Sequence, residues 1–299
     1  MNFNCVCFGE VLFDVLPNEK KAGGSPMNVA YHLTRLGHTA TLISRLGKDA
    51  AGQELKAILE KKNVNTDNIQ ADKIHPTGLV LAEPNDAGDM RYTIQEGVAW
   101  DFIELKPQYE SLVKNASYFI FGSLITRNKI SRSTLFNLLD IPVTRVFDVN
   151  LRPPFVEQSS LEYQFSKTDL LKMNEEELDT IAGWYVPFKT AEDKIRFLQN
   201  RFDIPHIIVT RGARGALVNR QDTFYYHEGY RVSVADTIGS GDSFVAGYLS
   251  GIINQKPPGE ALRFACALGA YVATQAGGCP DYTLNDIASA LPSAIQIIP

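Results

Sequence analysis

Cysteine is scarce in this sequence and long hydrophobic runs are absent. Each of these features argues against a particular class of protein. The four cysteines include no C-x-x-C pair, so a disulfide framework is not expected and a reducing cytoplasm fits. No stretch of about 18 apolar residues occurs, so no membrane span is expected. Near the N-terminus, Glu10 and Asp14 interrupt the apolar run and no basic region precedes it, which argues against a signal peptide.

An excess of positive charge and two common nucleotide-binding motifs are also missing. The formal net charge is −5, with no run of Lys or Arg, so no basic face for nucleic acid is expected. The sequence has no G-x-x-x-x-G-K-[ST] motif and no G-x-G-x-x-G after the first strand, which argues against a Walker-type site and a nicotinamide dehydrogenase. No His or Cys cluster has metal-ligand spacing. The 299 residues, 44% of them hydrophobic, suit one large α/β domain or two average domains.

Strand and helix patterns alternate along the first part of the chain. An apolar strand over residues 3–8 is followed by helical spacing over residues 27–36, where Gly37 is the expected C-cap. A strand at residues 40–45 and a helix at residues 52–61 continue the alternation, which predicts a parallel sheet covered by helices. Further strands are predicted at residues 118–121, 145–149, 170–173 and 206–210.

Residues 77–100 break this rhythm. The segments 79–83 and 91–95 have strand character, and the residues between them, 84–89, are rich in turn formers. We therefore expect a β-hairpin that lies outside the main sheet, where it can act as a lid.

The segment 236–244, D-T-I-G-S-G-D-S-F, carries the strongest functional signal. Apolar residues recur at helical spacing behind it, so a buried helix is expected to begin near Gly241. Asp242 then lies in the first helical turn, where the helix dipole favours its ionised form near neutral pH.

The composition of this turn predicts phosphoryl transfer to a hydroxyl group. Backbone N–H groups of Gly239, Ser240 and Gly241 can converge on an anion at the helix N-terminus. A phosphate and the Asp242 carboxylate repel each other unless a neutral hydroxyl lies between them. Asp242 would take the proton of that hydroxyl as its oxygen attacks a γ-phosphate, while the three amides stabilise the transferred charge.

A second string, G-G-S-P-M-N-V-A at residues 23–30, accompanies the first. The two strings resemble the N-terminal and C-terminal signatures of the ribokinase (PfkB-type) family of carbohydrate kinases. Pro26 and the string D-V-N-L-R-P-P at residues 148–154 resemble the fructokinases of that family. The resemblance runs over most of the chain.

The resemblance implies an α/β fold, the ribokinase-like three-layer αβα sandwich with a mainly parallel central sheet and a small β-sheet lid. We expect a single kinase domain over residues 1–299, with the lid inserted at approximately residues 11–22 and 74–100. By the same resemblance, the sugar is expected to contact Asp14, Gly23, Gly24, Asn28 and Arg152.

The string from Asp148 to Arg152 is similar to the D-x-N-x-R strand of the family. If the strand persists, its alternation places Asp148, Asn150 and Arg152 on one side. Three polar groups on one face at the carboxyl end of a strand would suit a ligand crevice.

Two further strings resemble the nucleotide site of the family, N-x-x-E at residues 174–177 and T-x-G-x-x-G at residues 210–215. The implied cofactor is ATP with Mg²⁺, which Glu177 would hold through water. A loop at Gly277 and Gly278 resembles the monovalent-cation loop, so K⁺ near Asp236 is also expected. The implied ATP-binding residues are Asn174, Glu177, Thr210, Arg211, Gly212 and Gly215.

The function predicted from the sequence is transfer of the γ-phosphate of ATP to a sugar hydroxyl, with fructose as the sugar. Kinases for 2-keto-3-deoxygluconate or ribose share the same chemistry and stay open as alternatives. A sugar- or nucleotide-binding regulatory protein on a kinase scaffold is the non-enzyme alternative. The expected partners are a small-molecule sugar and a second copy of the chain docked through the lid, with no nucleic acid and no membrane.

Overall fold

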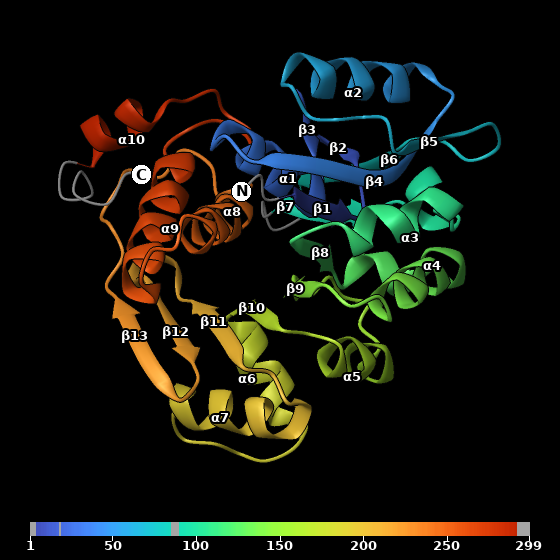
Figure 1. Cartoon of the computed structure of the whole chain (residues 1–299). Helices are drawn as coiled ribbons and strands as arrows, with labels where there is room; N and C mark the ends of the chain where they lie inside the picture. The colour runs from blue at the N-terminus through green and yellow to red at the C-terminus, as the bar shows by residue number, and fades with distance from the viewer. Residues whose placement is uncertain (1–3, 18, 85–89, 292–299) are drawn as a thin grey trace.

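The computed structural model describes residues 4–17, 19–84 and 90–291, which form a nine-stranded sheet and a four-stranded sheet. The large sheet has the order β13-β12-β11-β10-β9-β8-β1-β4-β5 (Figure 1). Neighbouring strands are parallel from β11 through β5, and β12 is antiparallel to both of its neighbours. The strands are β1 (Asn4–Phe8), β4 (Thr39–Gly47), β5 (Ile69–Asp72), β8 (Tyr118–Gly122), β9 (Thr144–Asp148), β10 (Leu170–Asn174), β11 (His206–Thr210), β12 (Ala216–Arg220) and β13 (Thr223–His227).

Helices cover both faces of this sheet, so the molecule has three layers (Figure 1). One face carries α1 (Ser25–Arg35), α2 (Ala50–Lys61), α8 (Ser240–Ile253), α9 (Pro258–Ala273) and α10 (Leu284–Ala290). The other carries α3 (Pro107–Lys114), α4 (Lys129–Leu139), α5 (Gln158–Ser166), α6 (Glu175–Gly183) and α7 (Ala191–Phe202). The predicted α/β class and its mainly parallel sheet are therefore confirmed.

Alternation along β1 divides its side chains between the two layers. Cys5 and Cys7 are buried in the core under α1 and α8, whereas Val6 and Phe8 are buried in the opposite core. Both cysteines are free thiols and pack as small apolar groups. A strand buried on both faces reads as a continuous apolar run, which explains why residues 3–8 show no polar alternation.

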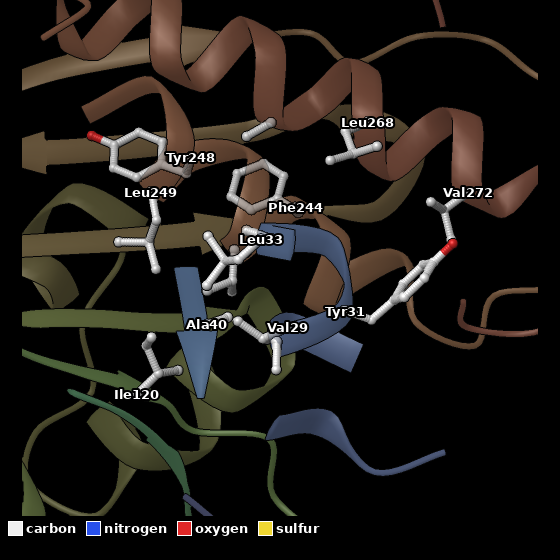
Figure 2. Close-up of a cluster of buried hydrophobic side chains, with 14 of the residues drawn as sticks. Val29, Tyr31, Leu33, Ala40, Ile120, Phe244, Tyr248, Leu249, Leu268 and Val272 are labelled. Carbon is white, nitrogen blue, oxygen red and sulfur yellow. The ribbon is translucent and has the colours of Figure 1, made fainter. Parts of the chain in front are cut away.

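Contacts between α1 and α8 hold the N-terminal and C-terminal parts of the chain together. Figure 2 shows Leu33 of α1 beside Phe244 and Leu249 of α8, with Val29 on the side of Ala40 and Ile120. Val29 and Leu33 are completely buried, and burial of such a side chain stabilises the fold by about 1.5–3 kcal/mol. The helix ends follow the predicted chemistry, since Gly37 takes a φ of +85° just after α1 ends.

The smaller sheet lies apart from the main one and has the order β3-β2-β6-β7. The predicted hairpin is confirmed as the antiparallel pair β6 and β7, but the predicted turn residues 85–89 lie outside the described residues. Two strands that the sequence patterns did not predict complete the sheet. The four strands are β2 (Leu12–Val15), β3 (Lys20–Gly23), β6 (Gly78–Pro84) and β7 (Met90–Ile94).

The expected alternation of Asp148, Asn150 and Arg152 is wrong, because the strand does not continue that far. β9 ends at Asp148, and Asn150 takes a left-handed φ of +45°. A left-handed residue ends the two-residue periodicity of a strand. Asp148 instead lies beneath the site and pairs with Lys172, while Asn150 and Arg152 reach the cavity described below.

Among the described residues, no helix combines the length and the apolar character that crossing a membrane requires.

Candidate active site

A cavity of about 520 Å³ opens between the small sheet and the carboxyl ends of the central strands. Leu12 and Val80 come from the small sheet, and Lys172 comes from the central strand β10. The first turn of α8 forms a further part of the wall through Gly241 and Asp242. The volume suits a small ligand such as a monosaccharide together with part of a second molecule.

Asp242 is held inside this cavity by the first turn of α1. Its Oδ1 atom accepts a hydrogen bond from Ser25 Oγ at 2.7 Å, and its Oδ2 atom accepts one from Asn28 Nδ2 at 2.7 Å. The Asp242 side chain lines the cavity although the residue is only 9% exposed. The carboxylate is therefore oriented by two side chains from the opposite end of the chain.

The surroundings of Asp242 act on its pKa in opposite directions. Burial raises the pKa above its ordinary value, and the nearby Asp148 carboxylate adds to this rise. Hydrogen bonds from Asn28 and Ser25, and then the Lys172 ammonium, lower the pKa. These effects are smaller than the rise, so the net pKa is above its ordinary value. The helix dipole, on which the sequence-based expectation of an ionised Asp242 depends, favours ionisation, and burial of the carboxyl group opposes it.

The glycines before α8 allow a close approach of backbone segments. Gly239 takes a φ of +74°, and a Cβ atom there would lie 2.4 Å from the Cα atom of Gly278. Gly239 and Gly241 line the cavity. Both donors of Ser240 are already used within the protein, because its Oγ atom donates to the carbonyl of Gly269 and its N–H group donates to the carbonyl of Thr237. The backbone at Gly239 and Gly241 is thus the better placed part of the expected anion site.

Four of the five residues expected to contact the sugar line the same cavity, namely Asp14, Gly24, Asn28 and Arg152. The fifth, Gly23, ends β3, and a Cβ atom at this position would lie 2.4 Å from Asp14 Oδ2. Glycine at position 23 therefore leaves room for the Asp14 carboxyl group. Burial raises the pKa of Asp14 to about 6, with Arg152 opposing the rise.

The residues expected to bind ATP form a second group at the ends of β10 and β11. Asn174 and Thr210 are neighbours in the parallel register of these strands. Asn174 and Glu177 form a capping box at the start of α6, in which each side chain accepts the backbone N–H of the other residue. Arg211, Gly212 and Gly215 form the tight turn after β11, where Gly215 takes a φ of +77°.

The donor set around Glu177 fits a Mg²⁺ ion held through water. Its Oε1 atom accepts the N–H group of Leu151 and its Oε2 atom accepts that of Asn174, and each carboxylate oxygen keeps a second lone pair. Within the described ranges, no group of three or more His, Cys, Asp or Glu side chains could enclose a metal ion. Mg²⁺ commonly keeps most of its waters and needs only one or two carboxylates, so the arrangement is compatible with it.

The glycine loop expected near Asp236 is indeed beside it. The N–H group of Gly277 donates to Asp236 Oδ2 at 3.0 Å. The same oxygen lies 3.2 Å from the Nζ atom of Lys21, which comes from β3 of the small sheet. This ammonium would have to move before a monovalent cation could bind the Asp236 carboxylate.

Among the polar side chains that line the cavity, those of Glu10, Ser25 and Lys172 were not predicted as site residues from the sequence. Lys172 was counted within an apolar strand segment, yet its Nζ atom lies 2.9 Å from Asp148 Oδ1 in a buried ion pair. A single charged residue in a strand that is buried on both faces requires a partner. The need for a partner was the signal available in the sequence, because Asp148 lies in the strand predicted just before it, at residues 145–149.

Comparisons with known proteins find carbohydrate kinases. A family model described as pfkB family carbohydrate kinase matches residues 3–283. The chain is 28% identical to probable fructokinase-2 of Arabidopsis thaliana, over 92% of this chain and 91% of that protein.

Two solved structures have the same fold. A fructokinase with bound ATP from Xylella fastidiosa superposes with a TM-score of 0.87 at 24% identity, covering 98% of this chain and 99% of that one. A double mutant of the fructokinase of Vibrio cholerae O395, in fructose, ADP and potassium ion bound form, gives 0.81 at 23% identity, covering 100% and 99%.

The chain therefore belongs to the pfkB family of carbohydrate kinases. It is an ATP-dependent sugar kinase, with relatives named as fructokinases. The family, the ribokinase-like fold with its small sheet and the type of enzyme predicted from the sequence are confirmed.

Proposed function

We propose that this kinase phosphorylates fructose and that Asp242 is its general base. The observation that carries the proposal is the position of Asp242 in the cavity, with both carboxylate oxygens oriented by α1. A base must reach the proton that it removes within hydrogen-bond distance. A hydroxyl that enters the cavity can replace Ser25 or Asn28 as the donor to Asp242.

In the proposed mechanism, the chain orients the sugar hydroxyl and then removes its proton. Asp14, Asn28 and Arg152 bind the other sugar oxygens, which holds the reacting hydroxyl against Asp242. The hydroxyl oxygen attacks the γ-phosphorus as Asp242 accepts the proton, and the bond to the β-phosphate oxygen breaks to release ADP. Backbone N–H groups at Gly239 and Gly241 donate to the transferring phosphoryl oxygens. Mg²⁺ bound with ATP would neutralise phosphate charge, and Glu177 would hold its water.

The charges that line the cavity favour a neutral sugar over a sugar acid. Three carboxyl groups face it, those of Glu10, Asp14 and Asp242, against the cations Arg152 and Lys172. At pH 8, above the pKa of about 7 for Glu10 and about 6 for Asp14, a sugar carboxylate would therefore meet more negative than positive charge, which supports fructose over 2-keto-3-deoxygluconate.

Relatives named as fructokinases and the fructose-bound Vibrio cholerae structure support the same choice. The decisive experiment is an ADP-release assay with fructose, ribose and 2-keto-3-deoxygluconate at equal concentrations. We expect the highest kcat/KM with fructose. A higher value with ketodeoxygluconate or ribose would reject fructose as the substrate and leave the sugar kinase assignment in place. The same assay with and without KCl tests the expectation that K⁺ binds near Asp236.

A further inference from the structure

Lys172 is a buried cation that the mechanism above does not use. The residue is 6% exposed, and its side chain lines the cavity beside the start of α8. A Cβ atom at Gly241 would lie 3.2 Å from Lys172 Nζ. The ammonium therefore lies directly against the backbone segment that is expected to bind the transferring phosphoryl group.

The hydrogen bonds of this ammonium are incomplete. Among the described residues, Lys172 Nζ donates to one acceptor, Asp148 Oδ1, at 2.9 Å. An ammonium has three N–H donors, and a buried charge that lacks partners is costly. Two donors are thus left for oxygen atoms of a molecule that occupies the cavity.

The group is charged at neutral pH. Burial lowers the pKa of Lys172, but the carboxylates of Asp148, Glu177 and Asp242 outweigh burial and raise it. A buried ammonium with spare donors, next to helix N–H groups, matches the needs of a phosphoryl group whose negative charge must be stabilised. A sugar hydroxyl is neutral and would gain less from it.

We propose that Lys172 is a catalytic residue that donates to the phosphoryl oxygens as the group passes from ATP to the sugar. Asp148 holds the ammonium in place, and Gly241 lacks a side chain because the ammonium and the phosphoryl group fill that space. The inference deepens the proposed function, on which it rests for the location of the phosphoryl group. In this role, the Lys172 ammonium stabilises the negative charge of the transferred phosphoryl group.

Removing Lys172 alone would not test this proposal, because an unpaired Asp148 in the interior could unfold the protein. The test is therefore the double variant Lys172→Met with Asp148→Asn, which removes both charges and keeps similar volumes. We expect a melting temperature close to that of the parent, a kcat lower by at least about 100-fold, as for loss of one transition-state donor, and a sugar KM within a few-fold. The matched control is Arg127→Met with Asp101→Asn, a buried pair at 2.7 Å whose residues do not line the cavity.

Three outcomes decide the matter. A double variant that keeps both its stability and its kcat would overturn the proposal, since the pair would then be structural. A raised sugar KM with unchanged kcat would overturn it as well, because Lys172 would then bind the sugar. Recovery of the parent kcat at pH 9 would also overturn it, because Lys172 would act only by lowering the pKa of Asp242. The experiment uses whichever sugar gives turnover, so a failed fructose assignment does not affect its result.

Discussion

Replacing Asp242 with asparagine should remove most of the turnover and leave the fold intact. In the parent protein, Ser25 Oγ and Asn28 Nδ2 each donate to one carboxylate oxygen at 2.7 Å. In the variant, the amide oxygen can still accept from Asn28, and the new NH₂ group can donate to the Ser25 hydroxyl, which is both donor and acceptor. The variant therefore keeps both contacts and loses the ability to accept a proton.

The expected size of the effect follows from the role of the carboxylate. Loss of a general base lowers the rate by about 10²–10⁴-fold, which corresponds to about 2.7–5.4 kcal/mol at 1.36 kcal/mol for each tenfold change. Burial and Asp148 raise the pKa of Asp242, so the folded state disfavours the ionised carboxyl group. At pH 8 the asparagine variant should thus be at least as stable as the parent.

The assay measures kcat and both KM values by ADP release, ATP binding by titration and the melting temperature on the same samples. Asp286→Asn is the matched control, because Asp286 also lies in the first turn of a helix, α10, and does not line the cavity. It should leave kcat unchanged. An Asp242→Asn variant with a kcat within about threefold of the parent, far short of the loss of a general base, would refute the reasoning. A loss of activity that parallels a large fall in melting temperature would refute the claim that the contacts are preserved.

Three further predictions concern the cavity and the small sheet. Asp14→Ala should raise the sugar KM by about 10-fold or more through loss of a charged hydrogen bond, with a smaller change in kcat. Asn28→Ala should raise the sugar KM and also lower kcat, because Asn28 donates to Asp242. Steady-state kinetics with varied sugar concentration checks both variants. Burial raises the pKa of Glu10 from 4.5 to about 7, so the contribution of Glu10 to stability falls as pH rises through that window. Glu10→Gln should therefore be more stable than the parent by up to about 3 kcal/mol at pH 8 but not at pH 4. Urea unfolding at both pH values measures the difference in the free energy of unfolding. If the small sheet is a lid, amides of β6 and β7 should gain hydrogen-exchange protection with saturating sugar, and unchanged exchange would reject closure. If two copies of the chain dock through this sheet, light scattering at dilute concentration should detect a dimer, and a clean monomer would exclude such docking.

The sequence predicted the elements whose side chains follow one period over a whole segment. The buried strand β1 and the amphipathic helix α1 both belong to this group, and the glycine after α1 marked the end of the helix. The C-terminal helix behind the D-T-I-G-S-G-D string was also located, because its apolar residues recur over several turns. In each case local pattern and tertiary burial agree.

Elements with weaker local signals were missed. β2 and β3 are four residues each, and only Leu12, Phe13 and Gly23 among them are buried, so neither strand is long enough to show a clear apolar pattern. The hairpin of β12 and β13 turns through Gln221 and Asp222, which take φ values of +50° and +63°. Such two-residue turns favour Asn-Gly or Asp-Gly, and Gln-Asp does not give that signal.

The same division applies to the site. Motif positions such as Asp14, Asn28 and Asp242 were found because their neighbours in the sequence identify them, and the structure brings the three together. Lys172 and Glu10 were missed as site residues, because their significance lies in what surrounds them in space. The end of β9 was misplaced since a left-handed Asn150 leaves no trace in an otherwise strand-like string.

The two hydrogen bonds that orient Asp242 join residues separated by 217 and 214 positions in the chain. Contacts of such long range close large loops and form late, after local structure has appeared. During synthesis, α1 must therefore wait for α8 before the base can take its working orientation. Activity should appear only when nearly the whole chain has emerged, so recovery of turnover during refolding would report the docking of the two ends rather than the formation of either half.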